Sequence, residues 1–308
     1  MFELLLTSFL LILTFYTIWK INARKYISSG TVASAYDAWT QDKLLERLWG
    51  EHIHLGFYPS EKKNIDFREA KVRFVHELVK WSGLDKLPKG SRILDVGCGI
   101  GGSSRILAKY YGFNVTGITI SPGQVKRARE LTPTGLNCNF QVMDALDLKF
   151  GDGSFDAIWS VEAGAHMNDK TKFADEMLRT LRPGGYLALA DWNSRDLREF
   201  PPSFFEKIVL KQLLEQWVHP NFISINEFST ILRTNKNSAG KVISENWNFY
   251  TNPSWYDSII EGARRPLAIL SLGPFALVKS IREIPTIILM NWAFKKGLME
   301  FGVYKCRG

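Results

Sequence analysis

The chain has 308 residues, of which 45% are hydrophobic and 23% charged, a balance typical of a globular protein and not of a disordered one. Its formal net charge is +8, but the basic residues are scattered with no run of five or more, which argues against a nucleic-acid-binding protein. The cysteines Cys98, Cys138 and Cys306 show no C-x-x-C spacing and are odd in number, so neither a disulfide framework nor a zinc site is expected.

The N-terminus differs from the rest of the chain. Residues 2–19 are almost entirely apolar, and a basic segment follows at residues 20–25. A bilayer-spanning helix needs about 17–25 residues, and a cleaved signal peptide would carry its positive charge before the apolar stretch. We therefore expect residues 1–25 to form an uncleaved single-pass membrane anchor, with the rest of the protein on the cytoplasmic face. A helix that lies on the membrane surface or packs on the domain is the alternative.

Helical spacing dominates residues 26–90, which we expect to form cap helices. Between residues 91 and 192, short apolar segments alternate with amphipathic ones. We predict strands at 92–97, 113–120, 139–145, 153–162 and 184–192, and helices at 103–111, 121–132 and 170–181. This alternation predicts an α/β fold, a Rossmann-like parallel sheet wound in right-handed units.

The pattern changes over residues 193–308, which we expect to supply substrate-cap insertions and the last strands of the sheet. Residues 193–240 and 253–299 read as helical, whereas 241–250 and 301–306 alternate like strands. The very apolar stretch 264–302 is interrupted by prolines into runs too short to span a bilayer. Two interpretations stay open for it: a buried pair of cap helices, or the wall of a site for a long lipid tail.

Ligands of parallel sheets bind at the carboxyl ends of the strands. Four predicted strand ends carry polar residues and should meet on one rim: Asp95–Gly102, Thr119–Ser121, Asp144 and Ser160–His166.

The glycine-rich segment 95–102 fits two cofactors. Gly97, Gly99 and Gly102 have dinucleotide spacing, whereas Gly97, Gly99 and Gly101, preceded by Asp95, suit S-adenosylmethionine (SAM), which has an ammonium group and no phosphate. Because a carboxylate beside a pyrophosphate is repelled by it, Asp95 favours SAM over a nicotinamide dinucleotide.

The second strand end lacks the acidic residue that holds ribose hydroxyls in either kind of site. Gln124, in the first turn of the next helix, is the candidate replacement, and Asp144 is a candidate for the adenine amino group or a helix N-cap.

Several segments together resemble the class I SAM-dependent methyltransferases, and within them the tocopherol-type branch that is related to the cyclopropane-fatty-acid synthases. The matching core segments are ILDVGCGIGG, GITISPGQ, FDAIWSVEAGAHM and LRPGG, and the outer ones are AYDAWT, WGEHIHLGFY, ADWNSRD and REIPTIILM. The resemblance extends from about residue 30 to the end of the chain.

The resemblance implies a role for each matching residue. The expected cofactor-binding residues are Asp95, Gly97, Gly99, Gly101, Thr119, Ile120, Gln124, Asp144 and Ala145, to which the strand-end pattern adds Ser160. Glu162 and His166 match the segment that faces the methyl group and the substrate, and Tyr36 and His54 match positions that close over the cofactor. Ala165 stands where relatives often have glutamate, so one helper carboxylate is missing.

The function implied is C-methylation of the aromatic ring of a prenylated (phytyl or solanesyl) benzoquinol in tocopherol and plastoquinone biosynthesis. The alternatives are a tocopherol-type or other lipid methyltransferase, including one that forms cyclopropanes on a lipid alkene. A nicotinamide-dependent oxidoreductase and a non-enzymatic membrane scaffold fit the residues less well. We expect membrane lipid as a partner, and neither nucleic acid, a metal nor an obligate protein partner.

A quinol ring carbon becomes a good nucleophile only when a hydroxyl group loses its proton, so the enzyme needs a base. Histidine titrates near neutral pH, which makes His166 a candidate. Glu162, four residues earlier, is the other candidate base or the group that orients His166.

Overall fold

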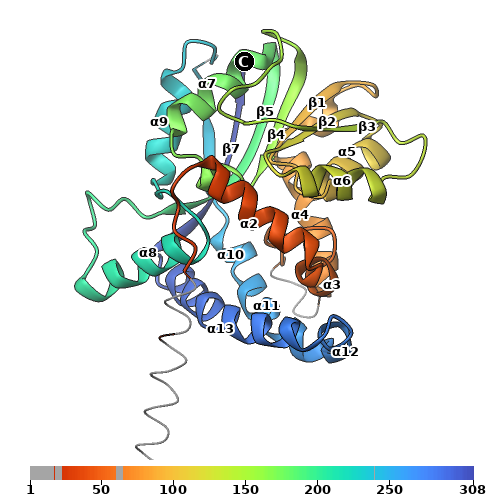
Figure 1. The fold of residues 1–308 in the computed structure, drawn as a ribbon. Helices are drawn as coiled ribbons and strands as arrows, with labels where there is room; N and C mark the ends of the chain where they lie inside the picture. Colours follow the sequence, from red (N-terminus) through yellow and green to blue (C-terminus); the bar gives the residue numbers. More distant parts are fainter. Residues whose placement is uncertain (1–16, 18–22, 60–64, 239) are drawn as a thin grey trace, which may run out of the picture.

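The computed structural model describes residue 17 and residues 23–59, 65–238 and 240–308, which form a seven-stranded sheet packed against helices (Figure 1). The strand order is β3-β2-β1-β4-β5-β7-β6. Neighbours from β3 to β5 are parallel, while β7 is antiparallel to both β5 and β6. The predicted Rossmann-like α/β fold is therefore confirmed, with β7 as an antiparallel strand in the otherwise parallel part of the sheet.

The strands are β1 (Arg92–Val96), β2 (Asn114–Thr119), β3 (Cys138–Val142), β4 (Phe155–Val161), β5 (Leu181–Ser194), β6 (Ile243–Asn246) and β7 (Met299–Arg307). The helices before β5 are α2 (Ser29–Gln41), α3 (Leu44–Trp49), α4 (Phe67–Ser82), α5 (Gly102–Tyr111), α6 (Pro122–Leu131) and α7 (Lys170–Thr180), with short 3-10 turns η1 (Leu84–Lys86) and η2 (Gly164–His166). Those after β5 are α8 (Phe204–Gln216), α9 (Ile225–Thr234), α10 (Asn248–Thr251), α11 (Pro253–Arg264), α12 (Pro266–Leu270) and α13 (Pro274–Lys295).

Local sequence explains where the helices begin. The Asp66 carboxylate accepts hydrogen bonds from two backbone N–H groups in the first turn of α4, a cap that contributes about 1 kcal/mol. The Ser121 hydroxyl accepts from the Gln124 N–H at 3.0 Å, and Pro122 supplies the first helical residue of α6. Because α6 begins directly after β2, Gln124 lies at the strand end.

Two elements after β5 differ from the prediction. The strand predicted over 241–250 is shorter, because the Asn246 side chain accepts a hydrogen bond from the Asn248 N–H at 2.9 Å and the chain turns into α10. Pro285 was expected to interrupt the apolar stretch, yet α13 continues through it. A proline removes one backbone hydrogen bond from a helix, which the packing of α13 tolerates.

The predicted membrane anchor over residues 1–25 lies outside the described residues, apart from residue 17 and residues 23–25. In the part of the chain that is described, no helix is both long and apolar enough to cross a bilayer. The longest apolar helix, α13, carries four charged residues, and Arg24 of the basic segment pairs with Glu283 of that helix at 2.5 Å. The predicted single-pass localisation, with the catalytic domain on the cytoplasmic face, is therefore wrong on these findings.

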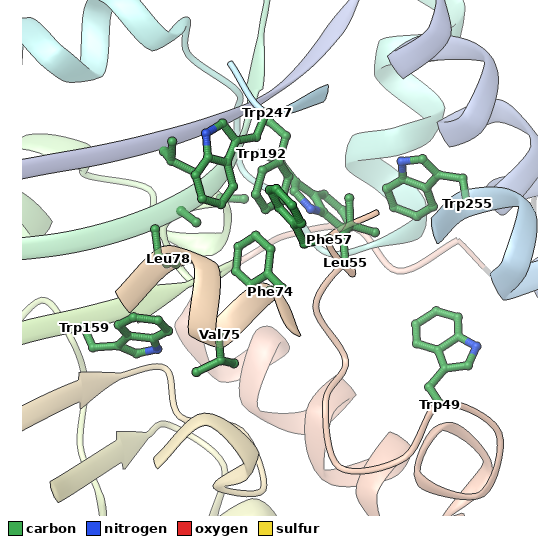
Figure 2. Packing of buried hydrophobic residues seen from close by; sticks show 14 of the residues in the cluster. Trp49, Leu55, Phe57, Phe74, Val75, Leu78, Trp159, Trp192, Trp247 and Trp255 are labelled. Carbon is green, nitrogen blue, oxygen red and sulfur yellow. The ribbon is translucent and has the colours of Figure 1, made fainter. Parts of the chain in front are cut away.

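One hydrophobic cluster joins the N-terminal helices, the sheet and the C-terminal helices. Figure 2 shows Phe57, Phe74 and Trp247 meeting in it; the Phe57 and Phe74 rings lie 5.3 and 5.9 Å from that of Trp247. Phe74 also packs edge-on against Phe301 of β7 at 5.7 Å. Such pairs add about 0.5–1.5 kcal/mol beyond their buried area. This packing holds the segment between α3 and α4 beside the strand ends.

Candidate active site

A cavity opens at the carboxyl ends of the strands, where β1 pairs with β2 on one side and with β4 on the other. This is the switch point at which ligands of open α/β sheets bind. Helix α2 and residues 51–55 form its outer wall. The sequence-predicted residues that line this active-site cavity are Tyr36, His54, Asp95, Gly97, Gly99, Thr119, Ile120, Gln124, Asp144, Ala145, Glu162 and His166.

Two predicted residues do not line it. Gly101 is the N-cap of α5 with a φ of 82°, and a Cβ there would meet the Phe140 ring and the Arg105 guanidinium. Ser160 is 1% exposed, and its hydroxyl donates to the Val96 carbonyl at 2.8 Å. Both residues hold the strand ends in position without facing the cavity.

The end of β1 and the loop after it combine an acidic residue with a close approach of the backbone to a neighbouring segment. Asp95 is 2% exposed, and one of its carboxylate oxygens accepts from the Ser104 hydroxyl at 2.5 Å. Burial raises the pKa of Asp95 to about 7. Gly97 has a φ of 78°, and a side chain there would overlap Ala163. A buried acid beside an open glycine backbone fits the ammonium end of SAM.

The loop after β2 carries the segment that was predicted to bind the ribose and that contains no acidic residue. The Thr119 hydroxyl donates to the Gln124 side-chain oxygen at 2.6 Å, which turns that amide toward the cavity. Asp37 of α2, which sequence reasoning missed, accepts from the Ser121 hydroxyl and, at 2.9 Å, from the Gly123 N–H. Asp37 thus fastens α2 to this segment, and the Gln124 side chain at the cavity could contact ribose hydroxyls.

Asp144 follows β3, where it was predicted to bind adenine or cap a helix. Its carboxylate accepts from the Leu146 N–H at 2.9 Å and closes a local turn. Asp144 and Ala145 both line the cavity. The second carboxylate oxygen of Asp144 takes no part in this turn and could accept a hydrogen bond from an adenine amino group.

Glu162 lies at the end of β4 in an unusual backbone conformation. Its φ is 54°, a region that costs a non-glycine residue about 1–3 kcal/mol and occurs at functional sites. One carboxylate oxygen accepts from the Leu55 N–H at 2.6 Å. Burial, with Asp191 nearby, raises the pKa of Glu162 to about 8, against the opposing effect of Lys71. Glu162 could therefore accept a proton under mildly alkaline conditions.

His166 ends the turn η2 and pairs with Tyr36 of α2. Its Nδ1 lies 3.3 Å from the Val218 carbonyl and its Nε2 lies 2.8 Å from the Tyr36 hydroxyl. A neutral ring then donates from Nδ1 and accepts from Tyr36 at Nε2. Burial lowers the pKa of His166 to about 4. The ring is thus neutral at physiological pH, and its basic nitrogen is already hydrogen-bonded.

Alternate residues of an extended strand point in opposite directions, but His52 and His54 do not. The segment is irregular, and the two rings instead touch, with His52 Nδ1 3.0 Å from His54 Nε2. His54 Nδ1 lies 2.8 Å from the Leu55 carbonyl and so donates to it, which leaves Nε2 as the acceptor from His52. Burial lowers the pKa of both rings, so both are neutral.

Three further residues in or near the cavity were not predicted from the sequence. Lys71 of α4 is 1% exposed and donates to the His52 carbonyl at 2.7 Å. A lysine between Phe67 and Phe74 on the apolar face of α4 is unusual, and this pattern could have marked Lys71 as a candidate site residue. Asp191 lies in β5 near Glu162, and because it lies at the end of the predicted strand 184–192, the strand-end rule would have found it. His219 follows α8, and no local pattern marks it.

No group of three or more His, Cys, Asp or Glu side chains in the described ranges could hold a metal ion.

Comparisons with known proteins place the chain in a family. Residues 94–189 match the family model described as a methyltransferase domain. The chain is 54% identical to 2-methyl-6-phytyl-1,4-hydroquinone methyltransferase of Synechocystis sp. over 288 residues, covering 94% of this chain and 91% of the relative. It is 34% identical to the chloroplastic tocopherol O-methyltransferase of Arabidopsis thaliana, covering 86% and 78% of the two chains.

A solved structure agrees in fold. A putative sarcosine dimethylglycine methyltransferase from Galdieria sulphuraria superposes with a TM-score of 0.74 at 22% identity, covering 86% of this chain and 97% of that one. The predicted enzyme class and SAM as cofactor are confirmed, and the nicotinamide alternative is excluded. The chain belongs to the class I SAM-dependent methyltransferases, in the branch that contains the phytyl-hydroquinone and tocopherol methyltransferases.

Proposed function

We propose that this methyltransferase methylates a ring carbon of a prenylated benzoquinol in tocopherol and plastoquinone biosynthesis. The observation that carries the proposal is a buried carboxyl group, that of Glu162, in a cavity lined by aromatic side chains. The activities named for the two curated relatives support the same substrate class.

The aromatic side of the cavity suits a flat ring. Trp192 lies 5.8 Å from Trp217 and 5.4 Å from Trp255, measured between ring centroids, and all three line the cavity. The indole N–H groups of Trp217 and Trp255 are buried and have no hydrogen-bond partner among the residues that the structure describes. A buried donor without a partner costs about 1–3 kcal/mol, so each gains by donating to a quinol oxygen.

SAM, when bound, supplies the methyl group, and Asp95, Gly97 and Gln124 would hold it. The chain's own contribution is to position the ring and to accept a proton. We assign the base to Glu162, because an acceptor whose pKa is about 8 is better matched to a phenol, whose pKa is about 10, than His166 at about 4. His166 then positions Tyr36 over the cavity, since the two share a hydrogen bond.

The membrane lipid predicted as a partner remains part of this proposal as the phase that carries the substrate. A quinol with a long isoprenoid tail partitions into lipid, because each buried methylene contributes about 0.8 kcal/mol.

The test is to incubate the purified enzyme with methyl-labelled SAM and, separately, a prenylated quinol, a tocopherol and a lipid with an isolated double bond. We expect label on a ring carbon of the quinol. Label on the tocopherol oxygen alone would move the function to O-methylation, and label on the alkene alone would indicate cyclopropane formation. Either outcome refutes the proposed C-methylation.

A further inference from the structure

A second hollow lies beside the active-site cavity. It is a cleft of about 490 Å³ between residues 25–26 of the N-terminal segment and α8, and we call it the α8 cleft. Its size is in the range of small-molecule pockets, about 300–1,000 Å³. The mechanism proposed above makes no use of it.

The α8 cleft adjoins the active-site cavity through two shared residues, because Tyr26 and His219 line both. His219 is 3% exposed and stacks on His166, with ring centroids 4.3 Å apart. Its ring also lies 5.2 Å from that of Trp192. A substrate group that extends past His166 therefore reaches His219 and, beyond it, the cleft.

The floor of the α8 cleft is apolar and its rim is charged. Leu210 and Leu214 are one helical turn apart on α8, and Lys207 and Lys211 share their face of the helix. Lysine stems cover apolar surface while their ammonium groups stay in water. Lys211 places its ammonium group at the rim, since its side chain is 69% exposed and the ammonium group lies 4.0 Å from the Glu215 carboxylate. Such a cleft suits a flexible hydrocarbon chain.

We propose that the α8 cleft binds the isoprenoid tail of the substrate, which leaves the active-site cavity between Tyr26 and His219. This inference rests on the proposed function, because it requires a substrate with a tail. The apolar stretch 264–302, one of whose two interpretations was a tail-binding wall, contributes no residue to either hollow among those described. Each methylene buried on the floor tightens binding by up to about fourfold, so KM should fall as the tail lengthens.

The test compares quinols that carry no tail, a 10-carbon tail and a 20-carbon tail, presented in the same detergent micelles. Leu214→Glu places a carboxylate on the cleft floor, and Leu214→Trp fills the cleft without adding charge. We expect both variants to raise KM for the 20-carbon substrate at least tenfold. We expect kcat/KM for the tail-less quinol to stay within twofold of the wild-type value. The matched control is Leu267→Glu, at a leucine of α12 that is 78% exposed, which should change neither.

Equal losses with the tailed and tail-less quinols, or an unchanged tail dependence in both Leu214 variants, would overturn the tail site. A loss specific to the long tail in Leu267→Glu instead would place the tail along α12. The wild-type enzyme separates this inference from the proposed function. If it methylates the quinols with and without tails, the function stands whatever the Leu214 variants do, and if it methylates none, both proposals fall.

Discussion

Replacing Glu162 by glutamine removes the proposed base and preserves the shape of the site. The glutamine side-chain oxygen can still accept the Leu55 N–H, which donates to Glu162 at 2.6 Å, so the segment beside the cavity stays in place. Loss of a positioned general base lowers the rate by about 10²–10⁴-fold. Because Glu162 is not assigned to the cofactor, we expect the Kd for SAM to change by less than about threefold, well under the 1.4 kcal/mol of a tenfold change.

The pH dependence gives this prediction a second, independent readout. Burial raises the pKa of Glu162 to about 8, and only the ionised form accepts a proton. The wild-type kcat/KM should therefore rise about tenfold per pH unit below pH 7 and level off above about pH 9. The folded protein also holds the Glu162 proton to higher pH than the unfolded chain, whose glutamate pKa is about 4.3. Folding stability from this group is thus lost as the pH rises from about 4 to 8, by at most about 1.4 kcal/mol per unit.

The assay is the initial rate of label transfer from SAM to a quinol between pH 6 and 9, with thermal unfolding measured in the same buffers. Glu162→Gln should lose the rate and, relative to wild type, gain melting temperature at pH 8. Glu199→Gln, at an exposed glutamate, is the matched control and should behave as wild type. A Glu162→Gln enzyme that keeps a tenth of the activity, or keeps an inflection near pH 8, would refute the assignment. A wild-type profile that is flat above pH 5 would favour His166, because burial lowers its pKa to about 4.

Three further substitutions test neighbouring contacts. Asp95→Asn should weaken SAM binding about 10–100-fold in calorimetry, because a charge-assisted hydrogen bond is worth about 1.5–3 kcal/mol. Wild-type SAM binding should weaken below pH 7, where the Asp95 carboxyl, with its pKa of about 7, becomes protonated. Asp95→Asn should not show this pH dependence. Tyr36→Phe leaves His166 Nε2 buried without its partner and should lower the free energy of unfolding in urea by about 1–3 kcal/mol, whereas no change would show that the pair contributes nothing. Lys71→Met removes an amine whose own pKa is lowered by burial and which, when protonated, lowers the pKa of Glu162. The midpoint of the kcat/KM profile should therefore move above pH 8, and an acid shift would contradict that electrostatic coupling.

The sheet was predictable because its signals are local. Each strand of the core is a short apolar run, and caps such as Ser121 before Pro122 mark where the helices begin. The parts after β5 were harder to predict. The alternating pattern of 241–250 did not reveal that Asn246 hydrogen-bonds to Asn248 and ends the strand. Pro285 reads as a helix breaker in isolation, but packing of α13 overrides the local preference.

The residues of the candidate site also fall into those that could be predicted from the sequence and those that could not. Residues at or just after the end of a strand within one contiguous motif, such as Asp95 and Glu162, could be placed on the rim from sequence, since parallel strands end at the same edge. Residues that other elements bring to that rim could not. Lys71 comes from α4, and His219 follows α8, and each reaches the cavity only through tertiary packing.

The choice of base shows why tertiary packing decides the chemistry. By intrinsic titration His166 is the natural base at neutral pH and Glu162 is not, because their unperturbed pKa values are about 6.5 and 4.3. Burial moves both pKa values in the direction that favours the neutral form, which reverses the order of the two residues as proton acceptors. The Tyr36 hydroxyl then occupies the basic nitrogen of His166, and it comes from a helix 130 residues away in the chain. A motif can therefore name two candidate bases, but only the packed structure can rank them.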